Sequence, residues 1–377
     1  MLKHRDSDYM DNRVERFNGT SYDFIALVNS SSEGGEAWTG TNTSGFSIMN
    51  TASYNIKDDD VPDSLMDREG ILMYKALGVC ATVDDFKAFL DTLSRPFGVE
   101  ANFGVIDAEG GASYFEVNNH KWYEFNVNDI AQGYRVVTNF CENGRKEDVA
   151  GYERYLSAQS IMSGIVASGD LNIADHSLLF KSFSRHYSSY VLGIDYSDNY
   201  DAMEAGGFFN GMAVDQDLIP RRITSASIVL EGVRKGENPL HTVMWTILGY
   251  PACSVAIPLL VGSSDHIPAY MKSSEFSENA LLCDKALYIK EKYVFPLSLG
   301  NGKKYVNLRA VLKGESSLPS LLSCCHSTEM EINESFRSIY LKWTSGIISE
   351  KEFFSRYDDA SKDYIDVYMR NFSSFLQ

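Results

Sequence analysis

The sequence predicts an α+β protein in which antiparallel sheets are covered by pairs of helices. Three observations predict this class. Short apolar runs separated by Gly- and Asn-rich turns fill much of the first third of the chain, a pattern typical of β-meanders. Helical sequence lies between these meanders and again after them. The resulting order (meander, helix pair, meander, helix pair, strands, helices) is not the strand–helix alternation of a parallel sheet.

The predicted strands fall into three groups, and the first contains a hairpin. Its two strands, 36–40 and 46–49, flank a short polar turn in which Gly45 can take a positive φ. The remaining predicted strands are 23–28, then 102–106, 112–117, 121–127 and 134–138, and finally 222–230, 242–248 and 254–260. The turns between them favour antiparallel pairing of sequential neighbours.

Capping residues and charge spacing predict the helices. Thr82 precedes the stretch 82–94 as its N-cap, acidic residues follow in its first turn, and Pro96 lies just beyond its end. Charges in helical register, such as Glu334 with Arg337, mark the C-terminal helices. The other predicted helices are 63–80, 148–166, 175–184, 277–293, 329–343 and 350–375. No Pro/Gly-rich linker interrupts the chain, so we expect one domain over 1–275 and a helical C-terminal region, 276–377, packed on it.

Composition excludes several classes of partner. The 377 residues carry a formal net charge of −17, whereas phosphate backbones and anionic membranes require clusters of Lys and Arg. We therefore expect no nucleic acid and no membrane as partners. No apolar run approaches the ~20 residues of a spanning helix.

No cofactor or metal is expected either. The six cysteines show no zinc-ligand spacing, and no phosphate-binding or dinucleotide-binding glycine motif occurs. The acidic runs 58–60 and 215–217 are interpreted as solvated loops, because calcium loops space their ligands differently. The first residues contain no secretory signal. This start indicates a cytoplasmic protein as printed, and a longer version would be exported if it carried a signal, so the compartment stays open.

Five polar residues at predicted strand ends form the candidate site: Arg5, Asp8, Asn50, Asn139 and Arg222. Asparagine amides are neutral donors suited to a developing oxyanion. An arginine beside a nucleophile lowers its pKa, and a carboxylate can hold an α-amino group. The alternative is structural, because strand-end Asn and Asp are common turn residues and an R-x-x-D is often a weak surface ion pair.

Four segments, in order along the chain, carry a resemblance to a known family. They are Lys3–Asp8, Trp38–Thr51, Val136–Phe140 and Pro220–Ser225. Through them the chain resembles the choloylglycine hydrolase and acyl-CoA:6-aminopenicillanate acyltransferase group of N-terminal-nucleophile hydrolases, including peptidase C45-like proteins of gut Bacteroidetes.

The resemblance implies a four-layer αββα sandwich and hydrolysis, or acyl transfer, at a non-peptide C–N amide bond of a small N-acyl substrate. It implies a nucleophile that is a cysteine exposed as the first residue, whose own α-amino group is the base. By motif, Arg5 flanks the thiol and Asp8 holds the α-amine. Asn139 and Asn50 contact the oxyanion, and Arg222 (or Arg221) completes the network. Family members form oligomers, so homo-oligomer formation is left open.

The nucleophile itself is missing from this chain. In the family the cysteine precedes the R-x-x-D by one strand and a turn, whereas only four residues precede Arg5 here. None of the six cysteines opens a strand before Arg5. Two hypotheses account for this. The start at Met1 is internal to a longer enzyme, which we favour, or the chain is a catalytically inactive ligand-binding protein of the same fold.

Overall fold

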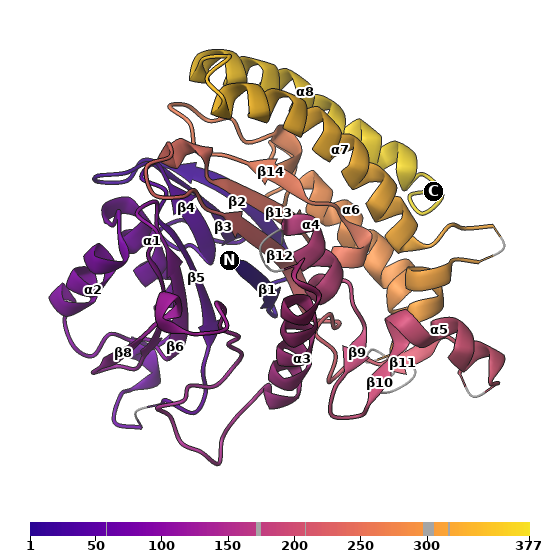
Figure 1. Ribbon diagram of the computed structural model, residues 1–377, viewed down its shortest axis with the longest axis horizontal. Helices are drawn as coiled ribbons and strands as arrows, with labels where there is room; N and C mark the ends of the chain where they lie inside the picture. Colours follow the sequence, from indigo (N-terminus) through magenta and orange to yellow (C-terminus); the bar gives the residue numbers. More distant parts are fainter. Residues whose placement is uncertain (58, 171–174, 208, 297–304, 316) are drawn as a thin grey trace.

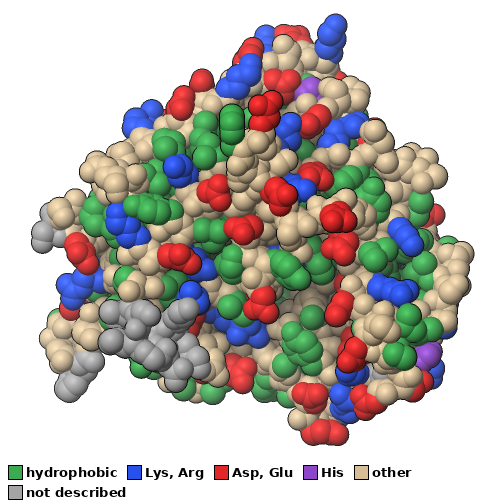
Figure 2. Space-filling view, turned by 180° about the vertical axis from the view of Figure 1, so that it is seen from behind, with side chains coloured by type: hydrophobic (Ala, Val, Ile, Leu, Met, Phe, Trp, Pro, Cys, Tyr) green, Lys and Arg blue, Asp and Glu red, His purple; other side chains and the backbone are tan. Residues whose placement is uncertain are grey.

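The computed structural model describes residues 1–57, 59–170, 175–207, 209–296, 305–315 and 317–377, which form an αββα arrangement of four layers (Figure 1). Two antiparallel sheets pack face to face, and helices cover their outer faces. This confirms the predicted α+β class. Acidic and basic side chains are interspersed over the face shown in Figure 2, so the negative charge is not gathered in one patch there.

The larger sheet has seven strands in simple sequential order, each antiparallel to the next. Short connections join most neighbours, as the meander pattern predicts, whereas the segment that contains α1 (Glu69–Val79) and α2 (Val83–Thr92) joins β5 to β6. Its strands are β2 (Asn12–Phe17), β3 (Phe24–Asn29), β4 (Thr39–Asn42), β5 (Ser47–Ala52), β6 (Ala101–Ile106), β7 (Ala112–Val117) and β8 (Trp122–Asn126).

The smaller sheet pairs the first strand of the chain with strands from its second half. Its order is β1 (Leu2–Asp6), β12 (Thr224–Glu231), β13 (Val243–Leu248) and β14 (Ile257–Leu259). β1 lies at one edge of this sheet, with Lys3 opposite Ile228 and Arg5 opposite Ala226. After β1, the bend 7–11 takes the chain directly into the other sheet.

Side-chain alternation divides the smaller sheet between two cores. Ile228 faces the larger sheet and belongs to the same buried cluster as Ile25 and Leu27. Trp245 faces outward and packs with Phe336 of the C-terminal helices. Because successive residues of a strand point to opposite faces, the strands of this sheet contribute side chains to both cores.

Two helices cover the larger sheet. α1 (Glu69–Val79) and α2 (Val83–Thr92) pack on β3 and its neighbours, and Phe86 lies among the rings of Phe103 and Phe115. α2 begins with a capping box in which the Thr82 hydroxyl accepts from the Asp85 N–H, as its sequence predicts.

The smaller sheet is covered mainly by the C-terminal helices. These are α6 (Leu281–Ile289), which continues into the π-helical turn η8 (Lys290–Val294), α7 (Leu321–Thr344) and α8 (Glu350–Asn371). α8 is fastened by buried hydroxyls: Tyr357 donates to the Pro258 carbonyl at 2.6 Å and Tyr368 to the Cys253 carbonyl at 2.8 Å. None of the described helices combines the length and apolarity needed to cross a membrane. The division at 275/276 stays a prediction.

The remaining described elements connect these layers or flank them (Figure 1). They are α3 (Tyr152–Ser168), α4 (His176–Leu179), η4 (Phe180–Ser184), α5 (Tyr196–Ala205), the short turns η1 (Asp63–Leu65), η2 (Val127–Asp129), η5 (Pro239–His241), η6 (Pro251–Cys253), η7 (Ala269–Met271) and η10 (Arg309–Lys313), and the strand pairs β9 (Ser188–Ser189) with β10 (Ile194–Asp195) and β11 (Met212–Val214) with β15 (Tyr305–Asn307).

The expected strand 134–138 does not form. The segment lies beside β5 and β6, but side chains hold its end: the Thr138 carbonyl accepts from the Thr51 hydroxyl at 2.9 Å and from the Asn102 amide at 3.4 Å. An apolar β-rich run is therefore extended here without a backbone ladder. α5 was not predicted, because its sequence carries little apolar periodicity.

A buried ion pair ties α7 to the smaller sheet. Both guanidinium nitrogens of Arg185 bind the carboxylate of Glu329, at 2.7 and 2.8 Å, and Arg185 also donates to the Pro251 and Ser254 carbonyls. Glu329 in turn accepts from the Ala256 N–H at 2.7 Å. The pair joins three segments that are distant in sequence.

Replacing Glu329 by Gln should therefore lower the free energy of unfolding by about 3 kcal/mol, because it leaves Arg185 buried without its counter-ion. Urea unfolding followed by circular dichroism measures this. Glu331→Gln is the matched control, since Glu331 lies on the same helix and binds Arg370 at the surface. Equal losses of unfolding free energy in the two variants would contradict the assignment of Arg185 and Glu329 as a stabilising buried pair.

Candidate active site

Arg5 is a buried cation whose recorded partners are all neutral. Its Nη1 donates to Asn12 Oδ1 at 2.6 Å and to Ser225 Oγ at 3.1 Å, and its Nη2 donates to Asn29 Oδ1 at 2.8 Å. The guanidinium lies 5.3 Å from the ring centroid of Trp38. Burial lowers the pKa of Arg5 to about 10, so the group keeps its charge at neutral pH.

Lys3 places a second cation on the same face of β1, because residues two apart in a strand point the same way. Its Nζ donates to the Asn50 side-chain oxygen at 2.6 Å and to the Asn50 carbonyl at 2.8 Å. Burial, and then the charge of Arg5, lower the pKa of Lys3. Buried charges are normally paired, and these two face only amides, hydroxyls and carbonyls in the described part of the chain. The arrangement favours an anion or a developing negative charge.

Asn139 lies beside the end of β5, next in space to the residue after Asn50. Its Nδ2 donates to the Ala52 carbonyl at 3.0 Å, with the Thr51 hydroxyl at 3.5 Å. Its Oδ1 accepts from Arg154 of α3 at 3.0 Å. Asn139 thus contacts the two residues that follow Asn50 on β5, and Lys3 links Asn50 to β1.

Asp8 and Arg222 are placed apart from these contacts. Asp8 is exposed in the bend after β1, and the described residues include no hydrogen-bond or ion-pair partner for its carboxylate. Arg222 precedes β12, and its backbone N–H donates to Asp215. Its neighbour Arg221 binds Asp6 at 2.6 Å on the other face of β1. The catalytic roles of Arg5, Asp8, Asn50, Asn139 and Arg222 stay predictions.

The six cysteines are all buried. Burial raises the pKa of Cys80, Cys141, Cys283 and Cys325 to about 12 and raises the pKa of Cys253 and Cys324 as well. Each is therefore a protonated thiol at neutral pH, whereas a cysteine nucleophile reacts as the thiolate. None of them meets the requirements of a nucleophile in this fold.

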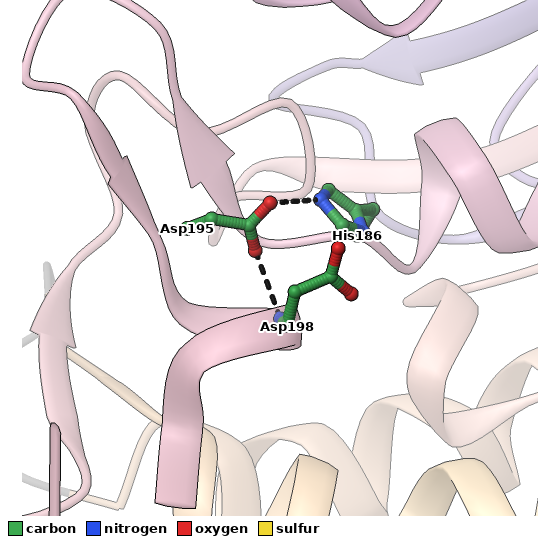
Figure 3. A group of neighbouring side chains, drawn as sticks. All are labelled: His186, Asp195 and Asp198. Carbon is green, nitrogen blue, oxygen red and sulfur yellow. Dashed lines mark hydrogen bonds and ion pairs between the residues drawn. The ribbon is translucent and has the colours of Figure 1, made fainter. Parts of the chain in front are cut away.

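A separate polar group lies at the start of α5. Figure 3 shows Asp195 between His186 and the first turn of that helix: it accepts from His186 Nε2 at 2.9 Å and from the Asp198 N–H at 2.9 Å. Atoms of His186, Asp195 and Asp198 that could bind a cation lie within 4.8 Å of one another, beside a cavity of about 440 Å³. The ion pair and the helix cap account for His186 and Asp195 without an ion, so this group supports no metal assignment.

The sequence-based search missed most of the polar groups around Arg5. They are Lys3, Asn12, Asn29, Trp38 and Ser225, and Arg154 beside Asn139 was missed as well. The pattern Lys3-x-Arg5 carries a usable signal, because two cations on one face of a buried strand require partners. The asparagines carry none, since their proximity depends on how the two sheets stack.

Neither a family model nor a curated protein matches the chain. Among solved structures, it is similar to a Caenorhabditis elegans N-acylethanolamine-hydrolyzing acid amidase ortholog, with 15% identity, 48% of this chain and 78% of that chain covered, and a TM-score of 0.37. It is also similar to penicillin V acylase from Agrobacterium tumefaciens, with 14% identity, 68% and 81% coverage and a TM-score of 0.35. A mutant of conjugated bile acid hydrolase from Clostridium perfringens gives 11% identity, 66% and 85% coverage and a TM-score of 0.35. All three TM-scores are below 0.5.

The buried thiols lead to a direct prediction. At pH 7 the native protein should react with a thiol reagent such as 5,5′-dithiobis(2-nitrobenzoate) at none of its six cysteines, because each is protonated and shielded. All six should react after unfolding in guanidinium. A cysteine that reacts within seconds in the native protein would contradict the assignment and would itself become a candidate nucleophile.

Proposed function

We propose that this chain carries the amide-binding and oxyanion side of an amidohydrolase or acyltransferase that acts on non-peptide C–N bonds of N-acyl small molecules. The observation that carries the proposal is the buried pair Lys3 and Arg5, which faces neutral acceptors beside Asn50 and Asn139. Cations and amide donors at one sheet edge can stabilise both a thiolate and a tetrahedral oxyanion.

The nucleophile in this proposal is an N-terminal cysteine on a further strand paired with β1. β1 has a single neighbour, β12, in the described sheet, so its other edge can accept a strand. A strand that leads into β1 through a hairpin turn runs antiparallel to it and begins opposite the far end of β1, beside Arg5. A cysteine at that start lies next to the guanidinium and close to the bend that carries Asp8.

The reaction then follows from the chemistry of such a cysteine. Its α-amino group takes the thiol proton, and the thiolate attacks the acyl carbon. A carbon–sulfur bond forms, Asn50 and Asn139 donate to the oxyanion, and the C–N bond breaks as the amine leaves with the proton. Water, or an acceptor amine, then cleaves the thioester. Arg5 stabilises the thiolate, Asp8 holds the α-amine and Arg222 completes the polar network.

A second candidate function is ligand binding without catalysis. It is favoured by the state of the six cysteines, which are buried and protonated. The polar edge around Arg5 is formed without a nucleophile, so it can hold an amide that it does not cleave. Homo-oligomer formation stays a prediction under both functions.

The test compares two proteins: the printed chain, and the chain extended by the in-frame residues encoded upstream of Met1. Hydrolysis of N-acyl amino acids and bile-salt conjugates is followed by amine release. The extended protein should be active, and replacing its new N-terminal cysteine by Ala should lower kcat on the order of 10⁶-fold. Arg5→Gln should lower kcat/KM roughly 10²-fold, whereas Arg16→Gln, at the far end of β2, should not.

The printed chain separates the two functions. It should release no amine, and isothermal titration should detect binding of the same compounds. An upstream stop codon with no cysteine codon after it would rule out the hydrolase for this gene product. Absence of heat with every compound would rule out the binding protein.

A further inference from the structure

Lys290 is a buried ammonium group for which the described residues provide no acidic partner. It opens the π-helical turn η8 and is 4% exposed. The recorded neighbours of its Nζ are the Met10 thioether sulfur at 3.9 Å and the Tyr250 ring, whose centroid is 6.0 Å away. A thioether is a weak acceptor. Burial lowers the pKa of Lys290 to about 8, with a further contribution from Arg222, so the group is mostly charged at pH 7.

Arg222 adds a second, half-buried cation near Lys290, with one buried nitrogen unsatisfied. Its Nε is buried and has no hydrogen-bond partner in the described part of the chain. Asp215 accepts from the backbone N–H of Arg222, so this contact leaves the guanidinium free. The segment 297–304, which lies outside the described residues and follows η8, contains no Asp or Glu.

Lys290 and Arg5 both contact the segment 9–12. The Met10 carbonyl is 3.6 Å from the thiol of Cys283, and the Tyr9 carbonyl accepts from Arg5 Nη1 at 3.4 Å. Cys283 is also close enough to influence the pKa of both Arg5 and Lys290. Tyr9 is 59% exposed and Met10 half-buried, so this bend reaches the surface.

We propose that Lys290 and Arg222 form a subsite for the carboxylate of an N-acyl amino acid whose amide bond lies at Arg5. This deepens the proposed function and rests on it. A guanidinium and an ammonium together match the two oxygens of one carboxylate. The Met10 thioether, the present neighbour of Nζ, gives way to a carboxylate oxygen. The C-terminal helical region thereby contributes a specificity residue to a site built on the first strand.

The charged and titratable groups around Lys290 determine the pH dependence. They are Arg222 before β12, Cys253 at the end of η6, Cys283 on α6 and Glu291 on its own turn, with Asp215 beyond Arg222. Cys253 and Cys283 are protonated at neutral pH, so Arg222 and Lys290 dominate. A carboxylate binds the charged form of Lys290, so affinity falls as pH rises through about 8, and bound carboxylate raises the pKa of Lys290.

The test uses two probes that differ in one charge, N-phenylacetylglycine and the uncharged N-phenylacetylglycinamide. Calorimetry should show that the protein binds the acid about tenfold more tightly, the size of one charge-assisted contact. Lys290→Met should abolish this preference by weakening the acid alone. The variant should also unfold at higher urea, because it removes an unpaired buried charge, so a loss of affinity cannot come from misfolding. Lys292→Met, on the exposed side of the same turn, is the control and should keep the preference.

A second measurement separates this inference from the proposed function. In protein labelled with ¹³C at lysine Cε, saturating N-phenylacetylglycine, or acetate alone, should raise the pKa of Lys290 by about one unit or more. A rise with acetate but no binding of either acyl probe would keep the anion subsite and reject the amide-binding function. No rise with acetate or the acid, or an unchanged preference in Lys290→Met, would overturn the subsite.

Discussion

The guanidinium of Arg5 connects the two sheets on which the rest of the molecule is built. It lies on β1 of the smaller sheet and reaches Asn12 and Asn29 at neighbouring ends of β2 and β3 in the larger one. It also binds Ser225 at the start of β12 and the Tyr9 carbonyl in the bend. One side chain therefore determines how the bend 7–11 carries the chain between the sheets. Because its acceptors are neutral, it forms this junction while keeping its positive charge.

That charge is part of a wider departure from ordinary packing. Four cations, Lys3, Arg5, Arg222 and Lys290, lie around the inner face of β1 and the bend, and no carboxylate side chain in the described residues bonds to their charged groups. Such groups cost stability, because buried charge normally requires a counter-ion. The Arg185–Glu329 pair shows the ordinary arrangement, in which a buried cation binds a carboxylate. Natural proteins depart from the rules of stable packing mainly at functional sites. The unpaired cations around β1 and the bend therefore mark a candidate functional site.

Apart from β2, for which the sequence predicts no strand, the strands of the larger sheet could be predicted because alternation and turn residues mark them locally. The pairing of β1 with β12 joins residues 220 positions apart, and no local pattern encodes it.

The same limit explains which site residues could be predicted from the sequence. Asn50 and Asn139 are predicted at strand ends; in the structure Asn50 lies within β5, which continues to Ala52, and Asn139 contacts Ala52. Lys290 was not found, because its approach to Met10 depends on how the C-terminal helices pack. The strand predicted at 134–138 was wrong for the opposite reason. Its sequence is strand-like, but side-chain hydrogen bonds hold the segment and no backbone ladder forms.

Arg5 and Lys290 are therefore not equivalent evidence for function. Every recorded contact of Arg5 also serves the fold, since it satisfies donors and joins two sheets, so a chain that had lost catalysis would still need it. The contacts of Lys290 do not explain its charge in this way. Its ammonium contacts a thioether and a ring, and a methionine of similar length would pack there without the cost of a buried charge. A charge that the fold does not require, beside an arginine whose Nε is unsatisfied, is explained by a ligand that supplies the missing anion. Ligand binding is consequently the property for which this structure gives the most direct reason, and it holds whether or not a nucleophile completes the site.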